Sequence, residues 1–316
     1  MRRNRKKISS RIKRGISDKK QRILLVILLV IASYLFGILS NKLMLAQDYQ
    51  REEISNDLQA PDKNLIAIQE KVLKDKYTFK IKWMDLGKRM VEDGVIDKVK
   101  LAQAVTGEDT LPNDLEKYFS SEQKQIDLTQ DNSHFWVDVL WGLGLANKNS
   151  ILEEGDMMAQ GDASNFASTG GWTLGKSENP MVYYSEFTYI NLSDKEQKIV
   201  EEIAGNVYRP CCGNSTVFPD CNHGMAMLGL IELMVSQNFS KDEIYKAALA
   251  FNTYWFPQTY LDIAYHFEKN GRDYEKIPAS QLLSKTFSSA MGYSAISEEV
   301  GSLPWPALES GGSCGA

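Results

Sequence analysis

Residues 209–224, RPCCGNSTVFPDCNHG, run directly into the apolar stretch 225–234, MAMLGLIELM, and the chain is organised around this junction. The first piece holds three of the four cysteines and one of the three histidines, and its two prolines and two glycines predict a stiff loop. The second piece predicts a buried helix. Cys221 and His223 therefore fall at or just before a helix N-terminus, where free N–H groups and the helix dipole favour a thiolate.

The pattern Cys-Cys-x8-Cys-x-His predicts a transition-metal site, because it gathers soft and borderline donors in one short loop. The predicted ligands are Cys211, Cys212, Cys221 and His223. Such a set suits copper, zinc or iron, and the spacing does not choose between them. Met225 and Met227 would add thioethers that favour copper, although their helix favours a core position. We expect metal binding to be coupled to local folding, because the loop has little apolar content.

Two other uses of the same cysteines remain open. A thiol–disulfide oxidoreductase would use Cys211, Cys212 and Cys221. Because a disulfide between neighbouring cysteines is strained, Cys221 or Cys314 would then be the resolving partner. An envelope scaffold would instead use the cysteines as structural disulfides, which persist in oxidising compartments. No H-E-x-x-H motif is present, and the one G-x-S-x-G spacing, residues 311–315 (GGSCG), falls in a Gly-rich tail, so the sequence leaves open whether the protein is an enzyme.

Residues 208–256 resemble, in the order of their elements, the membrane-anchored thiol protein of cytochrome c maturation. Arg209 precedes the cysteines, residues 240–244 (SKDEI) match a turn of that protein, and residues 254–256 (YWF) end the last helix. The C-x-x-C motif of that protein is replaced here by adjacent Cys211 and Cys212. The resemblance implies thiol chemistry and a partner among apo-metalloproteins or cytochromes.

The charge of the chain is divided between a basic head and an acidic body. Residues 1–22 carry eleven Lys/Arg and one Asp, whereas residues 43–316 carry 24 basic and 40 acidic side chains, a net charge of −16. The acidic body argues against nucleic acid as a partner. Residues 23–41 are uncharged and would span about 28 Å as a helix, which is close to the thickness of the hydrocarbon layer.

This N-terminal pattern predicts a single-pass signal anchor with a cytoplasmic N-terminus and an exported body. A cleaved signal peptide is the alternative, but the apolar and basic regions are long and no small-x-small cleavage site follows. We predict a basic cytoplasmic segment (1–22), a transmembrane anchor (23–41), a stalk (42–76) and an exported domain (77–316). The anchor makes the membrane the first partner and places the protein in the cell membrane.

The exported domain is predicted to be mostly α, with a little β structure and a long Gly/Ser-rich loop at residues 156–180. Residues 77–83 alternate as a short strand, and residues 134–147 form an aromatic-rich buried helix. Ser193 and Ser240 begin two capping boxes, with Glu196 and Glu243 as their partners. Asp220 is predicted to cap the helix that follows the cysteine loop.

Overall fold

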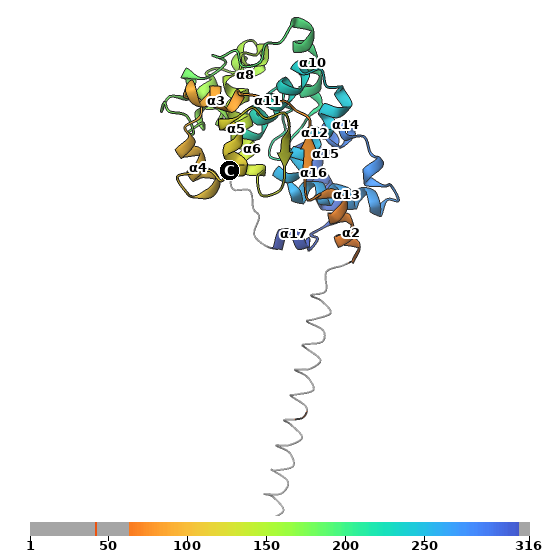
Figure 1. Ribbon diagram of the computed structural model, residues 1–316. Helices are drawn as coiled ribbons and strands as arrows, with labels where there is room; N and C mark the ends of the chain where they lie inside the picture. Colours follow the sequence, from red (N-terminus) through yellow and green to blue (C-terminus); the bar gives the residue numbers. More distant parts are fainter. Residues whose placement is uncertain (1–41, 43–62, 310–316) are drawn as a thin grey trace, which may run out of the picture. The chain divides into compact units, whose positions relative to one another are not determined.

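The computed structural model describes Lys42 and residues 63–309 (Figure 1). The predicted cytoplasmic segment 1–22, the predicted anchor 23–41 and the tail that carries Cys314 lie outside the described residues. Across the described part of the chain, no helix combines the length and the apolar character that a membrane span requires. The chain divides into two compact units, Met1–Pro61 and Asp62–Ala316, and the second unit is described below.

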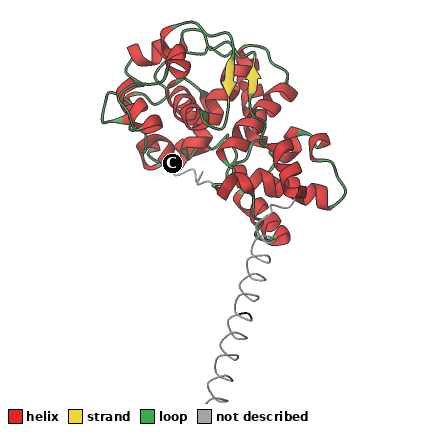
Figure 2. Ribbon diagram, turned by 60° about the horizontal axis from the view of Figure 1, so that its bottom comes forward, coloured by secondary structure: helices red, strands yellow, loops and turns green. Residues whose placement is uncertain are grey.

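The second unit is mostly helical, as the sequence predicted (Figure 2). Its longer helices are α2 (Lys63–Val72), α3 (Leu86–Glu92), α4 (Lys98–Thr106), α5 (Asn113–Ser120), α6 (Ser133–Ala146), α10 (Asp194–Asn206), α11 (Asn222–Ser236), α12 (Lys241–Trp255), α13 (Pro257–Lys269) and α16 (Ala290–Val300). The shorter ones are α7 (Ser150–Glu153), α8 (Asp156–Ala159), α9 (Ala167–Gly170), α14 (Ala279–Leu282), α15 (Lys285–Ser288) and α17 (Pro306–Glu309), with 3-10 turns at Ala163–Asn165, Pro180–Val182 and Tyr274–Lys276. Two strands, β1 (Tyr77–Phe79) and β2 (Ile126–Leu128), form an antiparallel pair.

Helices α6 and α11 lie side by side in the middle of the unit (Figure 1). Both are buried on nearly every side, which explains their apolar sequences. They cross at glycines: a Cβ on Gly144 would lie 2.1 Å from the Met225 carbonyl oxygen, and one on Gly229 would lie 2.7 Å from the Leu140 carbonyl oxygen. The two backbones can therefore approach this closely only because side chains are absent there.

A buried polar network joins the C-terminal end of α6 to the C-terminal half of α11. The side chain of Glu232 on α11 is fully buried and accepts hydrogen bonds from the side-chain amides of Asn147, over 3.0 Å, and Asn149. Asn147 in turn accepts the backbone N–H of Ile190 over 2.8 Å. Burial raises the pKa of Glu232 well above its usual value, and the two amides oppose this shift. The network ties α6, α11 and residue 190 together.

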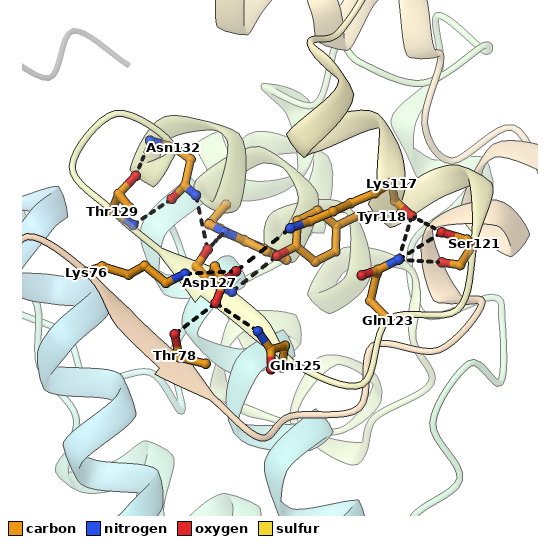
Figure 3. Close-up of polar contacts among 11 residues, drawn as sticks. Lys76, Thr78, Lys117, Tyr118, Ser121, Gln123, Gln125, Asp127, Thr129 and Asn132 are labelled. Atoms are coloured by element: carbon orange, nitrogen blue, oxygen red, sulfur yellow. Dashed lines mark hydrogen bonds and ion pairs between the residues drawn. The ribbon is translucent and has the colours of Figure 1, made fainter.

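The β1–β2 pair is held by contacts that converge on Asp127 (Figure 3). The Thr78 hydroxyl donates to Asp127 Oδ1 over 2.9 Å, and Lys76 lies 3.2 Å from Oδ2. The Tyr118 hydroxyl accepts the backbone N–H of Asp127 over 3.1 Å. The structure confirms a strand within the predicted range 77–83, although it is shorter than predicted.

Several local predictions are confirmed. Both capping boxes are formed, by Ser193 with Glu196 and by Ser240 with Glu243. Pro257 occupies the first turn of α13 and separates that helix from α12. The 156–180 stretch, in contrast, is not the continuous loop that the sequence predicted, because it contains α8, the 3-10 turn Ala163–Asn165 and α9. Its Trp172 is packed inward, with only 2% of its surface exposed.

Helix α2 belongs to the 42–76 stretch that the sequence assigned to a stalk. It packs against α13, and its Leu65, Ile68 and Val72 are buried. Lys71 on α2 forms an ion pair of 2.8 Å with Glu268 on α13. This part of the stretch is therefore a component of the folded unit.

Candidate metal centre

The cysteine loop connects α10 to α11 and brings three sulfur atoms to one point. The Sγ atoms of Cys211, Cys212 and Cys221 all lie within 4.8 Å of one another, and those of Cys211 and Cys221 are 3.6 Å apart. Two thiolates on one metal ion, each about 2.3 Å from it, are separated by about 3.8–4.0 Å. The three sulfurs are therefore close enough together to hold a single ion. Within the described residues this is the one His/Cys/Asp/Glu group with such spacing.

The three thiols differ in their access to solvent. Cys211 is exposed, while Cys212 and Cys221 are half-buried, and all three are free cysteines. A disulfide requires a sulfur–sulfur distance of about 2.05 Å, so the 3.6 Å separation of Cys211 and Cys221 is a contact between thiols. An incoming ion or a reactive partner would meet Cys211 first.

The structure brings together three of the four predicted ligands. His223 is outside the three-sulfur group: its imidazole packs against Trp255 and Phe256, with ring centroids 5.5 and 4.6 Å away. Burial lowers the pKa of His223 to about 4, which keeps the imidazole neutral. Met225 and Met227 are fully buried in α11, as expected for core residues.

Arg209 lies behind the sulfurs and is fully buried. Its Nη2 atom donates to Cys212 Sγ over 3.2 Å and to Asp220 Oδ1 over 2.8 Å. The guanidinium also packs on the first turn of α11, where a Cβ on Gly224 would lie 2.6 Å from Arg209 Cζ. Burial alone would lower the pKa of Arg209, but the charges of Cys221 and the other neighbouring acidic groups raise it. A permanent positive charge therefore faces the three thiols.

The proton distribution among the thiols follows from these contacts. Hydrogen bonds donated by Cys211 and Cys212 lower the pKa of Cys221, and the Arg209 charge and the Gly224 N–H act in the same direction against burial. Donating those hydrogen bonds raises the pKa of Cys211. Cys221 is the N-cap residue of α11, as the sequence predicted. These contacts favour deprotonation at Cys221 over Cys211.

The predicted capping role of Asp220 is wrong. The carboxylate accepts from Arg209 and, through Oδ2, from the Asn214 side-chain amide over 2.8 Å, so it is occupied within the loop. Its backbone carbonyl accepts the N–H of Ser168, which joins the loop to α9. The physical reason is the difference in free-energy cost. A buried guanidinium without a carboxylate partner destabilises the protein more than an uncapped helix N-terminus does.

Sequence reasoning missed the role of Arg209. It noted this arginine only as the residue that precedes the cysteines, since a charged side chain is rarely fully buried. The one available signal was its place between the end of a helix and the cysteines. Its Nε and Nη1 atoms are buried without a hydrogen-bond partner among the described residues.

A second set of ionisable groups lies on α6, near the start of α11. Asp138 is buried, and burial raises the pKa of its carboxyl group to about 7. The Nε2 atom of His134 is 3.8 Å from Asp138 Oδ2, and burial lowers the pKa of His134. The positive charge of His134 also contributes to lowering the pKa of His223.

The far side of the cysteine loop borders a pocket of about 320 Å³. It is lined by Ser150, Ile151, Glu154, Gly155, Asp156, Glu201 and Val217. Val217 is the loop's contribution, and none of the three cysteines lines this pocket. The sulfur cluster and the acidic pocket are therefore separate features.

Comparison of the chain with protein-family models, with curated proteins and with solved structures gave no match. The functional argument therefore rests on the site itself.

Proposed function

We propose that this is a membrane-anchored, exported protein that binds a transition metal through Cys211, Cys212 and Cys221 and acts in metal delivery or in cytochrome or oxidase assembly. The convergence of three sulfurs within 4.8 Å carries the proposal. Copper, zinc and iron are the candidate ions, since thiolates bind all three. The anchor and the exported location rest on the sequence of residues 1–41.

The loop is fastened by contacts that involve no sulfur atom. Thr216 is fully buried, and both its backbone N–H and its hydroxyl donate to the Val207 carbonyl over 2.9 Å. The Tyr208 N–H donates to Leu283 O over 2.9 Å, and its carbonyl accepts from Asn252 Nδ2 over 3.1 Å. These anchors do not involve the cysteines, and the expected coupling of metal binding to local folding stays a prediction.

A thiol–disulfide oxidoreductase is the second candidate, and it is favoured by one observation. The Sγ atoms of Cys211 and Cys221 touch at 3.6 Å, and the exposed member of the pair faces solvent. Loss of two protons and two electrons to an acceptor disulfide would join them, while that acceptor is reduced to two thiols. The resemblance of residues 208–256 to a cytochrome c maturation protein supports the same candidate.

The two functions are separated by anaerobic purification of the full chain in detergent, followed by elemental analysis. We expect about one metal ion per chain, with the thiols released only after chelation. Cys211→Ser, Cys212→Ser and Cys221→Ser should each lose the metal. Cys314→Ser, in a Gly-rich tail outside the described residues, is the matched control and should keep it.

The other outcomes have definite meanings. A metal-free protein with one reducible disulfide, whose reduction yields two reactive thiols, would establish the redox function instead. A metal-free protein whose cysteines resist mild reductant would make the loop a structural scaffold, and the proposed function would be wrong.

A further inference from the structure

Cys211 and Cys221 are placed to form a disulfide with each other. Their Sγ atoms are in contact at 3.6 Å, and the two residues lie ten positions apart in the sequence. A disulfide requires a sulfur–sulfur distance of about 2.05 Å, so these two atoms need to approach by only about 1.5 Å. Cys211 is exposed, so a reaction partner can reach this member of the pair directly.

Cys212 is engaged by groups outside the cysteine set. Its Sγ atom accepts from Arg209 Nη2 over 3.2 Å, and its backbone carbonyl accepts the N–H of Ala290, the first residue of α16, over 2.9 Å. A disulfide between Cys212 and its neighbour Cys211 would also be strained. The contacts therefore favour pairing of Cys211 with Cys221 and leave Cys212 as the third, unpaired sulfur.

The same sulfur atoms cannot bind a metal ion and form a disulfide at the same time. The metal ligand is the thiolate, the deprotonated form of cysteine. In a disulfide each sulfur is bonded to another sulfur and carries no negative charge, so closing the Cys211–Cys221 pair removes two of the three ligands. The single thiolate of Cys212 cannot hold an ion that requires three or four protein ligands.

Building on the proposed function, we infer that the three-sulfur group is a redox-gated metal site, which releases its ion when Cys211 and Cys221 form a disulfide. The electron acceptor is a disulfide on a partner molecule. Disulfides persist in oxidising compartments, which agrees with the proposed export of this domain. Metal binding and thiol oxidation are then two states of one site.

The exchange balances in atoms and electrons. The Cys211 thiolate attacks one sulfur of the acceptor disulfide, which breaks the acceptor S–S bond, forms a mixed disulfide and releases one acceptor thiolate. The Cys221 thiolate then attacks Cys211 Sγ, which forms the intramolecular S–S bond and releases the second acceptor thiolate. Two electrons pass from the two cysteines to the acceptor. The ion leaves in its original oxidation state, and the sulfur of Cys212 stays reduced.

The contacts that anchor the loop remain in both states. The bonds of Thr216 to Val207, and of Tyr208 to Leu283 and Asn252, contain no sulfur atom, so formation of the disulfide breaks none of them. We therefore expect reduction of the disulfide to restore metal binding.

The test uses the full chain in detergent with the Cys314→Ser substitution, so that only the three loop cysteines remain. The reduced protein is loaded anaerobically with Zn²⁺, which has no redox chemistry of its own, or with Cu(I) if it takes up no zinc. Oxidised glutathione is then added. A chromophoric chelator measures the released ion, and alkylation with peptide mass mapping locates the remaining thiol. We expect about one ion released per disulfide formed, the free thiol on Cys212, and renewed binding after dithiothreitol.

Two variants separate the disulfide from the metal site. Cys212→Ser removes the third ligand and keeps the pair, so it should lose metal binding and still form the Cys211–Cys221 disulfide. Cys221→Ser removes a member of both, so it should bind no metal and form no intramolecular disulfide.

Redox gating and the proposed function fail in different ways. If the reduced chain binds an ion and keeps it after the disulfide has formed, gating is wrong and the proposed function stands. The same conclusion follows if the disulfide includes Cys212, or if oxidised glutathione leaves the loaded protein unchanged. A reduced chain that binds neither Zn²⁺ nor Cu(I) would overturn the proposed function and gating together.

Discussion

The Nη2 atom of Arg209 donates to the Sγ atom of Cys212 over 3.2 Å, and the guanidinium that makes this contact is fully buried. The same nitrogen reaches Asp220 Oδ1 at 2.8 Å. One side chain thus links a predicted metal ligand to the carboxylate that fastens the loop. This contact contributes to the shape of the loop.

Arg209→Met should therefore damage both stability and metal binding. Removing one partner of a buried ion pair typically costs about 3 kcal/mol of unfolding free energy. Because Asp220 is partly exposed, we expect the loss to be no larger than this. Denaturant unfolding and metal competition measure the two effects. Arg272→Met, at an exposed arginine that packs over the Phe267 ring, is the control and should lower stability far less and leave metal binding unchanged. An Arg209→Met protein with wild-type stability would show that the guanidinium does not organise the loop.

His223→Gln should retain the bound metal, because the three sulfurs form a group without the imidazole. The protein should be less stable, since the ring contacts with Trp255 and Phe256 are lost. Elemental analysis of the folded variant measures the outcome. Loss of the metal with an unchanged helical circular dichroism signal would restore the four-ligand set predicted from the sequence.

Glu232→Gln should destabilise the protein even though it removes a buried ionisable group. Both carboxyl oxygens accept from asparagine amides, and a glutamine would turn one donor toward another donor. Rotation of Asn147 is blocked, because its oxygen accepts the Ile190 N–H. We expect a loss of about 1–3 kcal/mol, as for an unsatisfied buried polar group.

Denaturant unfolding at neutral pH provides the measurement for Glu232→Gln. The matched control is Glu298→Gln at an exposed position on α16. Equal stability of the two variants would mean that the network adds nothing to folding.

Asp138→Asn should change how stability depends on pH. Burial raises the pKa of Asp138 to about 7 from an ordinary value of 3.8, so between these values the folded protein binds a proton that the unfolded chain has lost. The contribution of the Asp138 carboxyl group to the unfolding free energy is therefore fully present below about pH 4. It is lost as the pH rises from about 4 to about 7. The loss is at most about 4 kcal/mol, at 1.36 kcal/mol per pH unit.

Unfolding free energies of wild type and Asp138→Asn, measured from pH 4 to pH 8, give the test. The difference between the proteins should grow in favour of the variant as the pH rises. Parallel curves would show that folding does not raise the pKa of Asp138. Stabilisation of its negative charge by His134 would have that effect.

The predicted topology can be tested with a membrane-impermeant thiol reagent on intact cells. The net charge of +10 in residues 1–22 predicts that the N-terminus is cytoplasmic. The exposed Cys211 should therefore be labelled from outside. Ser9→Cys, in a chain whose four native cysteines are serines, should be labelled only after lysis. Labelling of Cys211 only after lysis would contradict export.

Local sequence patterns were sufficient to predict the elements that depend on neighbours in the chain. The capping boxes at Ser193 and Ser240 and the helix start at Cys221 all follow from backbone groups that are satisfied within a few residues. The mostly helical fold and the proximity of Cys211, Cys212 and Cys221 follow from the same short-range information.

Only the tertiary structure decided which groups at the site meet. His223 is close to Cys221 in sequence, but the side of α11 on which it lies faces the aromatic rings of Trp255 and Phe256. Ala290 is 78 positions from Cys212 in the sequence, yet its backbone N–H donates to the Cys212 carbonyl oxygen. Such contacts depend on how helices pack, because a contact between two distant segments leaves no periodic signal in the sequence of either one.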